Sequence, residues 1–472
     1  MSAAVVWLRR DLRLRDHPAL RAALDEHDRV VPVFCFDDRL LGGRHASGTR
    51  TGFLLECLGE LDRELRRRGS GLVIRRGIPE REIAALAAEA GAEIVHHSGD
   101  VGPYAVRRDR RARRRLAAHG VELRAHPGLF AVDDVGALRT AQGGAYTVFS
   151  PFHRTWAAEE RRPVFAAPRR LPALPSRLRK GRLPSLAALG LGREVADPPA
   201  GGESAARRAV DRFLAGPVSR YAGARGALGD DGTSRLSPYL HFGCVTPRQL
   251  EERLGAGDGP DAFGRQLAWR DFHHHVLANF PGNARSELRS RFRGMPWSRA
   301  RRPFDAWREG RTGYPLVDAG MRQLRREGWM HNRARLVVGS FLTKDLGIDW
   351  RWGERHFMRL LVDGDEANNN GNWQWIASVG TDPAPAFRRT YNPARQQERH
   401  DPDGRYVRRW VPELAKVPDE YLSEPWTMPA AVQRRVGCVI GEDYPEPIVD
   451  HATARAEALA RYRARAAARR PQ

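Results

Sequence analysis

The stretch VVPVFCF, residues 30–36, decides the fold class, because it is apolar throughout and carries no charged side chain. A strand with one face in water alternates apolar and polar residues, so an unbroken apolar run indicates a strand buried on both faces. Such strands are typical of parallel sheets that are covered by helices on both sides. The stretch therefore predicts an α/β architecture.

Further strand-like runs alternate with amphipathic helical patterns through residues 1–130. These runs are AVVWL (4–8), LVIRR (72–76), EIVHHS (93–98) and VELRAH (121–126). One helical pattern ends on Gly69, and another is expected to start at Asp16, ahead of His17 and Pro18. Alternating βα units predict a doubly wound, parallel five-stranded sheet. No GxGxxG motif follows the first run, so a dinucleotide site of Rossmann type is not predicted.

The remainder of the chain divides into two parts. Proline recurs through RRPVFAAPRRLPALPSRLRKGRLPSL (161–186), so we expect residues 131–200 to form an interdomain linker that wraps over the surface. Residues 201–472 carry helical patterns without convincing strand pairs, which predicts an all-α domain. The basic segment ARAEALARYRARAAARR (454–470) is expected to be a solvated helical tail.

The charge of the chain points towards a polyanionic partner. A net charge of +22 and a pI near 10.9 favour nucleic acid, although a G+C-rich genome would also raise the arginine content. The cysteines are scattered without a CxxC pair, which indicates a reduced cytosolic protein with no disulfide frame or zinc site. No apolar run approaches the ~20 residues needed to span a bilayer. We therefore expect a soluble, cytoplasmic protein.

Two polar segments have compositions that suggest a site. Thr233, Ser234 and Ser237 surround Arg235 ahead of an apolar helix, which suits either phosphate binding or an ordinary helix cap. The stretch DGDEANNNGNWQW (363–375) begins like a surface turn but runs into two tryptophans, which a solvated loop does not need.

Six motifs together resemble the photolyase/cryptochrome family, in the family's order and spacing. They are VVWLRRDLRLRDHPAL (5–20), DGTSRLSPYLHFG (231–243), WRDF (269–272), GYPLVDAGMRQL (313–324), GWMHNRARL (328–336) and DGDEANNNGNWQWIASVGTDPAPAFRR (363–389). The resemblance covers nearly the whole chain and is strongest to class I cyclobutane pyrimidine dimer photolyases. It implies an α/β antenna-type domain over 1–130 and a helical FAD-binding and DNA-binding domain over 201–472.

The resemblance also implies how FAD is held. The cofactor contacts that it implies are Tyr221, Thr233, Ser234, Arg235, Leu236, Ser237, Phe263, Arg270, Arg335, Asp363, Gly364, Asp365 and Asn369. Arg335 is the implied ion-pair partner of Asp363. Asn369 matches the residue that faces flavin N5, where a neutral amide suits an enzyme that works from the fully reduced flavin anion.

An electron-transfer chain is implied by Trp373, Trp350 and Trp297, which match the family's route from the flavin to the surface. Trp375 is expected to be a core residue. The remaining asparagines of the stretch, Asn368 and Asn370, are expected to have no special role.

DNA contacts are implied for Arg225, Gln266, Trp269, Arg333, Arg335 and Gln396. Arginines on phosphates would hold the strand, and Trp269 could stack on a flipped-out base. Flipping is required because the flavin must come within contact range of the lesion, and damaged dinucleotides stack poorly, which lowers the cost of extrusion.

Three positions bear on the choice of lesion. Cyclobutane-dimer enzymes usually have Glu where this chain has Gln266, and Gln there is more typical of six-four photolyases and animal cryptochromes. Those proteins, however, have a histidine pair where this chain has Asn332 and Leu336. Asn332 matches the cyclobutane-dimer enzymes, which usually have Met in place of Leu336. We therefore interpret the site as a cyclobutane-dimer site with an altered acceptor.

The antenna and metal predictions rest on two other segments. Folate-binding members have an Asn-Glu pair where this chain reads GDVGPYAVRRDR (99–110), so a deazaflavin antenna is favoured over folate, with another flavin or an empty pocket as alternatives. Residues 273–275 read HHH, but consecutive helix positions point in different directions and no carboxylate lies at ligand spacing. They are expected to be structural or solvent histidines, and no metal site is predicted.

The leading hypothesis is a monomeric, light-driven lyase that repairs cyclobutane dimers in UV-damaged DNA with reduced FAD, without membrane attachment. The alternatives are a blue-light receptor with little repair activity, a six-four photolyase, and a generic basic nucleic-acid binder.

Overall fold

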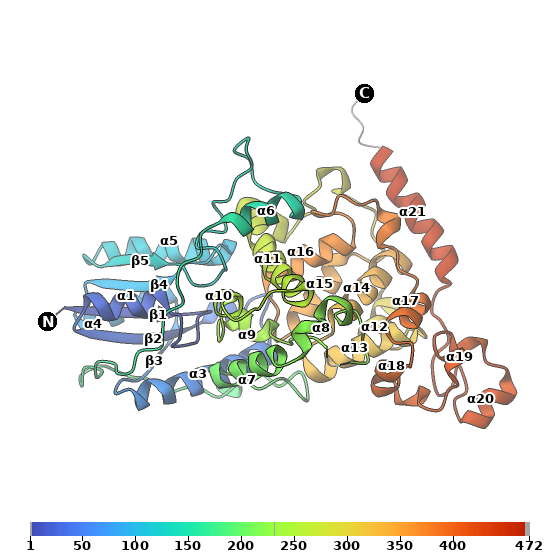
Figure 1. The fold of residues 1–472 in the computed structure, drawn as a ribbon, viewed down its shortest axis with the longest axis horizontal. Helices are drawn as coiled ribbons and strands as arrows, with labels where there is room; N and C mark the ends of the chain where they lie inside the picture. Colours follow the sequence, from blue (N-terminus) through green and yellow to red (C-terminus); the bar gives the residue numbers. More distant parts are fainter. Residues whose placement is uncertain (1, 231, 468–472) are drawn as a thin grey trace.

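The computed structural model describes residues 2–230 and 232–467. The α/β part and the helical part lie side by side, with the sheet on the left of Figure 1 and the helical domain on the right. The strands are β1 (Ala3–Leu8), β2 (Arg29–Asp37), β3 (Val73–Gly77), β4 (Ile94–Ser98) and β5 (Glu122–His126). They form a parallel five-stranded sheet in the order β3-β2-β1-β4-β5, so the predicted sheet is confirmed.

Helices cover both faces of this sheet. The helices of the α/β part and its flank are α1 (Pro18–Glu26), α2 (Asp38–Leu41), α3 (Gly48–Arg67), α4 (Pro79–Ala90) and α5 (Pro103–Ala117). Side chains alternate along β1: Val6 packs towards α1 and α3, whereas Val5 packs towards α4 and α5. Both sets are buried, which explains why the strands are apolar at successive positions.

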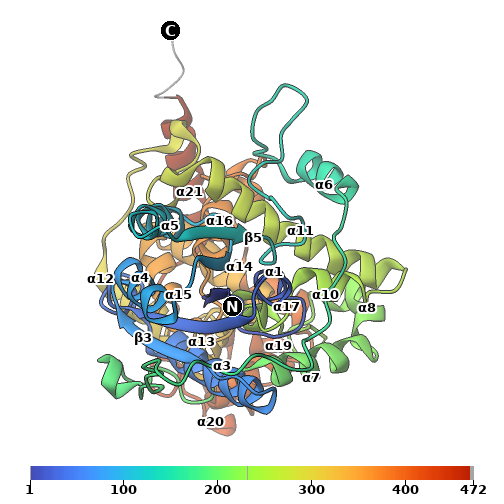
Figure 2. The same ribbon diagram turned by 90° about the vertical axis from the view of Figure 1, so that its left-hand side faces the viewer.

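The order of the strands places a crevice where β1 and β4 are neighbours, because their connections leave in opposite directions from that point. The residues that follow β1, Arg9 to Asp11, and those that follow β4 meet there. Arg10 leaves this edge of the sheet and reaches the helical domain. Figure 2, viewed from the sheet side, shows the helical domain behind this edge.

The start of α1 differs from the prediction. The side chain of His17, not of Asp16, caps the helix, with Nδ1 accepting from the Leu20 backbone N–H at 3.1 Å. Asp16 has a positive φ and is buried against Arg162 and Thr246, at 2.5 and 2.6 Å. The carboxylate of Asp16 therefore connects the loop between β1 and α1 with Arg162 and with the start of α10 (Pro247–Glu251) at Thr246.

The helical domain and the segment before it contain the remaining elements. They are α6 (Phe149–Ala158), η1 (Ala187–Leu189), α7 (Glu203–Leu214), α8 (Pro217–Ala224), α9 (Ser237–Phe242), α10 (Pro247–Glu251), α11 (Asp258–Asn279), η2 (Pro281–Ala284), η3 (Ser290–Phe292), α12 (Arg301–Glu309), α13 (Pro315–Glu327), α14 (Asn332–Ser340), the π-helical turn η4 (Phe341–Asp345), α15 (Trp350–Leu360), α16 (Glu366–Ile376), η5 (Ala386–Arg389), α17 (Pro393–His400), α18 (Arg405–Trp410), η6 (Pro412–Leu414), α19 (Asp419–Leu422), η7 (Pro425–Thr427), α20 (Ala430–Val436) and α21 (His451–Ala467).

The C-terminal helix is not the solvated tail that its basic composition suggested. Ala454, Ala458 and Tyr462 of α21 recur at helical spacing and are buried. Tyr462 joins the main core cluster of the helical domain, and its ring lies 5.8 Å from that of Phe292. The basic side chains occupy the other face, and the final residues 468–472 lie outside the described part of the chain.

The described cysteines, Cys35, Cys57, Cys244 and Cys438, are free and buried. Within the described ranges, no helix is both long enough and apolar enough to cross a membrane.

Candidate active site

A cavity of about 630 Å³ lies at the centre of the helical domain. Its wall is formed by α8, α9, α11, α14 and α16, together with Arg10 from the end of β1. A cavity of this size falls in the range of small-molecule and cofactor pockets. The predicted site residues that line it are Tyr221, Arg225, Thr233, Ser234, Arg235, Leu236, Ser237, Phe263, Gln266, Trp269, Arg270, Asn332, Arg333, Arg335, Asp363, Asp365, Asn369 and Trp373.

Helix α11 supplies one wall because its pocket residues recur on one face. Phe263, Gln266, Arg270 and His273 are three or four positions apart, so they project in the same direction. Helix α16 also contributes to the wall, and it approaches α11 closely at Gly371. A Cβ at Gly371 would overlap the ring of His273, so a glycine is required there.

Asp365 begins α16 and is the electrostatic centre of the site. Its Oδ1 accepts from the Asn368 backbone N–H at 2.8 Å, which is an N-cap. Its Oδ2 lies 2.6 Å from Arg10 Nη2 and 3.3 Å from His274 Nε2. Burial alone would raise the pKa of Asp365, but the nearby His274 and Arg10, together with His241 at 3.6 Å, hold that pKa well below its usual range. Asp365 is therefore an anion buried at the junction of the two domains.

One carboxylate oxygen of Asp363 is paired within the protein, and the other is available to a ligand. Its Oδ2 accepts from Arg335 Nη2 at 2.8 Å, as the resemblance implied. Its Oδ1 is buried and has no hydrogen-bond partner among the described residues, although Asp363 lines the cavity. A buried carboxylate oxygen without a partner is unfavourable by about 1–3 kcal/mol. A ligand with hydrogen-bond donors, such as the ribose and ring nitrogens of FAD, would complete this site, so the residues fit the cofactor.

The segment before α9 lies on the same cavity. Arg235 has a positive φ, and its guanidinium lies 4.4 Å from the ring centroid of Trp329. Trp329 Nε1 donates to Ser237 Oγ at 3.3 Å, so the indole ties this segment to the loop before α14. Hydroxyls and a cation face the cavity here, an arrangement that suits phosphate groups. Asp231, the first residue of the quoted motif, lies outside the described residues.

Asn369 has a buried partner that sequence reasoning missed. Its Nδ2 donates to the backbone carbonyl of Glu354 at 3.0 Å and to Glu354 Oε1 at 3.1 Å. Burial raises the pKa of Glu354 to about 7, and Arg44 and the bond from Asn369 reduce that rise only in part. The amide oxygen of Asn369 therefore stays free for the cavity, while its nitrogen is fixed by Glu354.

The three tryptophans of the predicted chain come from adjoining segments of the helical domain. Trp373 lines the cavity and packs against Gly353 of α15, where a Cβ would overlap its ring. Trp350 lies three positions before Gly353 on the same helix, hence on the same face. An isolated bridge between Ser298 and Ile348 brings Trp297 alongside the start of this helix. Trp373 and Trp350 are buried, and Trp297 is half-buried.

A second group of aromatic rings also starts at Trp373. Its ring lies 6.2 Å from that of Trp307, which is fully buried.

Trp375 is not the core residue that we expected: it is half-buried on the cavity wall, with the Arg389 guanidinium 3.6 Å from its ring centroid. Asn368 also lines the cavity and donates to Asp365 Oδ1.

Most of the predicted DNA-binding residues line the cavity, with the exception of Gln396. Trp269 lies parallel to Phe149 of α6, with ring centroids 3.8 Å apart, so one indole face is supported and the other is left for the cavity. Gln266, one turn earlier, donates to the Ala262 carbonyl at 3.3 Å and is half-buried. Asn332 and Leu336 of α14 line the same cavity.

Positive charge is concentrated beside these residues. Burial lowers the pKa of Arg333, and Arg399 and Arg225 lower that pKa further because the neighbouring guanidinium groups repel one another. Burial and the charges of Arg333 and Arg335 also lower the pKa of His331 to about 4. Such a local field attracts a polyanion.

Four predicted residues do not line the cavity: Gly364, Gln396, Trp350 and Trp297. Gly364 packs on Arg50, and a Cβ there would meet that side chain at 2.5 Å. Gln396 is half-buried on α17. Conversely, Arg10, His241 and His273 line the cavity but were not predicted. Arg10 and His241 lie within the quoted family motifs and His273 directly follows another, but no role was assigned to them from the sequence.

The three consecutive histidines are all buried, so none is a solvent residue. His275 Nε2 accepts from the Tyr146 backbone N–H at 2.9 Å, which is a structural contact. His274 instead lies beside Asp365, and His273 faces the cavity. Their different directions follow from their consecutive positions on a helix.

Comparison with known proteins agrees with this geometry. Residues 4–174 match the family model described as DNA photolyase, and residues 263–464 match the one described as FAD binding domain of DNA photolyase. A deoxyribodipyrimidine photo-lyase of Streptomyces griseus is 45% identical over 97% of this chain and 98% of its own length. A cryptochrome DASH of Gloeobacter violaceus is 37% identical, over 94% of this chain and 93% of its own length.

Solved structures give the same picture. A bacterial class III photolyase from Agrobacterium tumefaciens has a TM-score of 0.91 and 34% identity, with 98% of each chain covered. An archaeal photolyase from Sulfolobus tokodaii, described with two FAD molecules, has a TM-score of 0.82 and 30% identity, with 98% of this chain and 100% of the other covered.

Proposed function

The chain belongs to the DNA photolyase/cryptochrome family, and we propose that it uses light to repair cyclobutane pyrimidine dimers in DNA. Relatives at 36–45% identity over nearly the whole chain carry the name deoxyribodipyrimidine photo-lyase. The proposal assigns the same carbon–carbon lyase reaction to this protein.

The observation that supports the proposal is that one cavity is lined by both sets of residues to which we assign roles, in cofactor binding and in lesion binding. We assign cofactor binding to Asp363 and Asn369, and lesion binding to Trp269 and Asn332, and all four line this cavity. An extruded lesion bound by the second pair would therefore lie in the same space as the cofactor. This proximity is necessary because the lesion must reach contact range of the flavin.

FAD in its reduced state would supply the chemistry, donating an electron to the dimer on excitation and recovering it after both ring bonds have split, without net redox change. The chain's contribution is to hold that cofactor and exclude water. Asp363 and Asp365 would bind donor groups, and Thr233, Ser234 and Ser237 would bind phosphates. Asn369, fixed by Glu354, would present its oxygen to the flavin ring.

On the DNA side, we assign strand binding to the arginines and lesion binding to the cavity wall. Arg225 and Arg333 would contact phosphates, whose negative charge would relieve their mutual repulsion. Trp269, supported from behind by Phe149, would stack on the flipped base. Gln266 and Asn332 would donate amide hydrogens to the lesion, and Gln396 remains a proposed backbone contact.

We also propose that Trp373, Trp350 and Trp297 carry an electron from the surface when the flavin has been oxidised. Hops between indoles would replace a single long transfer.

We propose a division into the α/β domain (1–130), the linker (131–200) and the helical domain (201–472), with an antenna in the first of these. A deazaflavin is our preferred antenna, a second flavin is the alternative that the Sulfolobus structure suggests, and the protein is proposed to act as a monomer.

Lesion-resolved photorepair tests the function. The reduced protein is illuminated with blue light in the presence of oligonucleotides that contain either a cyclobutane dimer or a six-four product, and the natural protein is compared with Gln266→Glu. We expect catalytic repair of the cyclobutane dimer and faster repair by Gln266→Glu, because a carboxylic acid can share a proton with the lesion. Failure to repair that dimer at catalytic protein concentration would exclude the proposal, and repair of the six-four product would favour the second lesion class.

A blue-light receptor is the other candidate, because a relative is named cryptochrome DASH and Gln266 replaces the usual Glu. A light-dependent change in partner binding, without repair of either lesion, would support it.

A further inference from the structure

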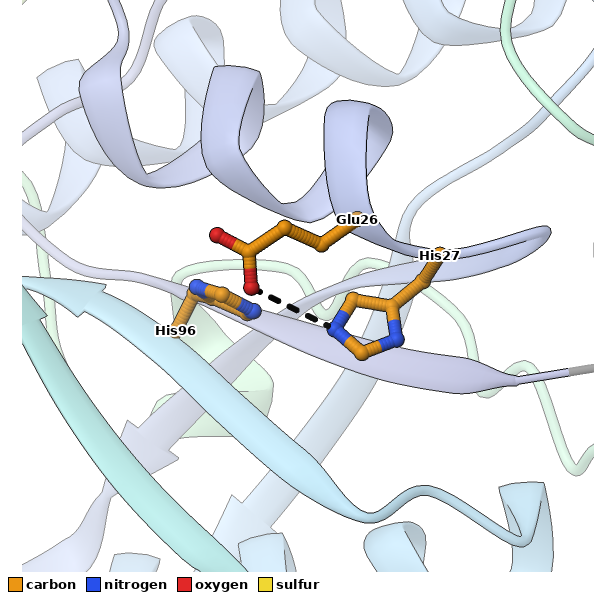
Figure 3. A group of neighbouring side chains, drawn as sticks. All are labelled: Glu26, His27 and His96. Atoms are coloured by element: carbon orange, nitrogen blue, oxygen red, sulfur yellow. Dashed lines mark ion pairs between the residues drawn. The ribbon is translucent and has the colours of Figure 1, made fainter.

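A cluster of metal-ligand side chains lies on the α/β domain, remote from the cavity lining. Glu26 and His27 are at the end of α1, and His96 projects from the middle of β4 towards them (Figure 3). One ligand atom from each residue lies within 4.8 Å of the other two. None of the three lines the cavity of the proposed active site.

The imidazoles of this cluster have buried nitrogens that the protein leaves unpaired. His96 is 0% exposed, and its Nε2 has no hydrogen-bond partner among the described residues. Both ring nitrogens of His27 are buried and likewise have no partner within the described chain. Buried polar atoms are nearly always satisfied, so an unpaired nitrogen on each of these two neighbouring rings indicates a missing ligand between them.

A neighbouring histidine prepares His96 for that ligand. His96 Nδ1 and His126 Nε2 are 2.8 Å apart, and their rings stack with centroids 5.0 Å apart. In the tautomer with the proton on Nδ1, His96 donates to His126 and leaves a lone pair on Nε2. Metal-binding histidines commonly donate their second N–H in this way, which fixes the orientation of the ring.

The spacing of the carboxylate suits an ion better than a direct contact. His27 Nε2 lies 3.9 Å from Glu26 Oε2, which is too long for a hydrogen bond. Two ligand atoms bound to one tetrahedral ion at ~2.1 Å are about 3.4 Å apart, so only a small closure is needed.

The charges around the cluster remain favourable for a cation. Arg124 Nη1 lies 2.7 Å from Glu26 Oε2, which holds the carboxylate in place but opposes a cation. Glu122 pairs with the same arginine at 2.9 Å and offsets its charge. The Glu26, Glu122 and Arg124 group therefore keeps a net negative charge.

We propose that Glu26, His27 and His96 bind a divalent transition-metal ion, with Zn²⁺ as the preferred occupant. Two imidazoles and one carboxylate form a ligand set typical of zinc, whereas oxygen-rich sets bind calcium or magnesium. A water molecule would complete the tetrahedron on the exposed side of Glu26. The ion would tie the end of α1 to β4 and so stabilise the α/β domain, without a role at the active site.

Zinc titration of the tag-free, FAD-bound protein tests the proposal after removal of metals with a chelator. We expect one Zn²⁺ per chain by equilibrium dialysis, and a rise in the unfolding temperature on addition of zinc. Glu26→Gln and His27→Gln should each weaken binding by about tenfold or more, and His126→Phe by roughly 10- to 100-fold. X-ray absorption at the zinc edge should show two imidazole ligands.

A matched control is His119→Gln, which removes an exposed histidine of the same domain outside the cluster. It should bind zinc like the natural protein. Equal binding by His27→Gln and His119→Gln would overturn the proposal, as would the absence of stoichiometric binding. Because His27 is half-buried at the C-cap of α1 and His96 is fully buried in the sheet, the His27 variant should fold even if a His96 variant does not, and flavin absorbance provides an independent check of folding.

Discussion

Replacement of Glu354 by Gln should stabilise the protein at alkaline pH. Glu354 is 4% exposed, and burial raises its pKa from an ordinary 4.5 to about 7. The folded state therefore binds this proton more tightly than the unfolded chain does. Below about pH 4.5 both states are protonated and no penalty exists. As the pH rises towards 7, the unfolded chain ionises first, so the stability of the folded state falls.

The magnitude follows from the two pKa values. One pKa unit corresponds to about 1.4 kcal/mol, so ionised Glu354 costs up to about 3 kcal/mol above pH 7. Gln cannot ionise, and its side-chain oxygen can still accept from Asn369 Nδ2. The advantage of Glu354→Gln should therefore be near zero around pH 4.5 and grow to its full value between pH 4.5 and 7.

Thermal unfolding from pH 5 to pH 8, at a fixed concentration of added FAD, measures this difference. The expected gain at pH 8 corresponds to about 3 °C for a chain of this size. Glu420→Gln, at an exposed position of α19, changes the formal charge equally and serves as the control. An effect of Glu354→Gln that is constant across this pH range, or that favours the natural protein at pH 8, would refute the reasoning.

Three further predictions concern the cavity. Asp363→Asn should weaken the affinity for FAD by at least about tenfold, because Arg335 loses its charged partner, and the purified protein should contain less flavin per chain; flavin titration measures the affinity and absorbance measures the flavin content. Trp373→Phe should slow photoreduction of the oxidised protein under illumination, while repair by chemically reduced protein stays within about twofold; equal loss of both would contradict a relay role. Arg333→Gln should reduce the slope of log affinity for DNA against log salt concentration by about one, and an unchanged slope would remove Arg333 from the phosphate contacts.

The sheet could be predicted from the sequence because its signal is local. Strands buried on both faces must be apolar at successive positions, and VVPVFCF shows this directly. The family motifs in turn predicted most of the cavity wall, including the ion pair of Asp363 with Arg335. These residues lie within short segments whose order and spacing are informative.

Helix α16 shows why composition failed as a guide. Three consecutive asparagines and a glycine have low helix propensity, so the segment resembles a turn. The helix forms because Asp365 caps its start and because Asn369, Asn370 and Trp373 are buried against neighbouring helices. Gly371, unfavourable in an isolated helix, allows the approach to α11. Tertiary packing therefore overrides the local preference.

The partners of Asp365 could not be predicted for a different reason. Arg10, His241 and His274 come from the end of β1, from α9 and from α11, and only the fold brings them to one carboxylate. Arg10 and His241 lie within the quoted motifs, but nothing in the sequence pairs either of them with Asp365.

The contact between Arg10 and Asp365 also gives the α/β domain a part in the cofactor pocket. Its crevice between β1 and β4 places Arg10 in the cavity, so the domain contributes to the cofactor pocket directly, in addition to any antenna that it holds. Without Arg10, the buried Asp365 would lose a contact of 2.6 Å and would keep only His274 and His241, 3.3 and 3.6 Å away. Burial lowers the pKa of His241 to about 4, so this ring supplies no compensating charge near neutral pH. Because a buried carboxylate is stable as an anion only when it is paired, the helical domain requires the α/β domain in order to keep Asp365 ionised.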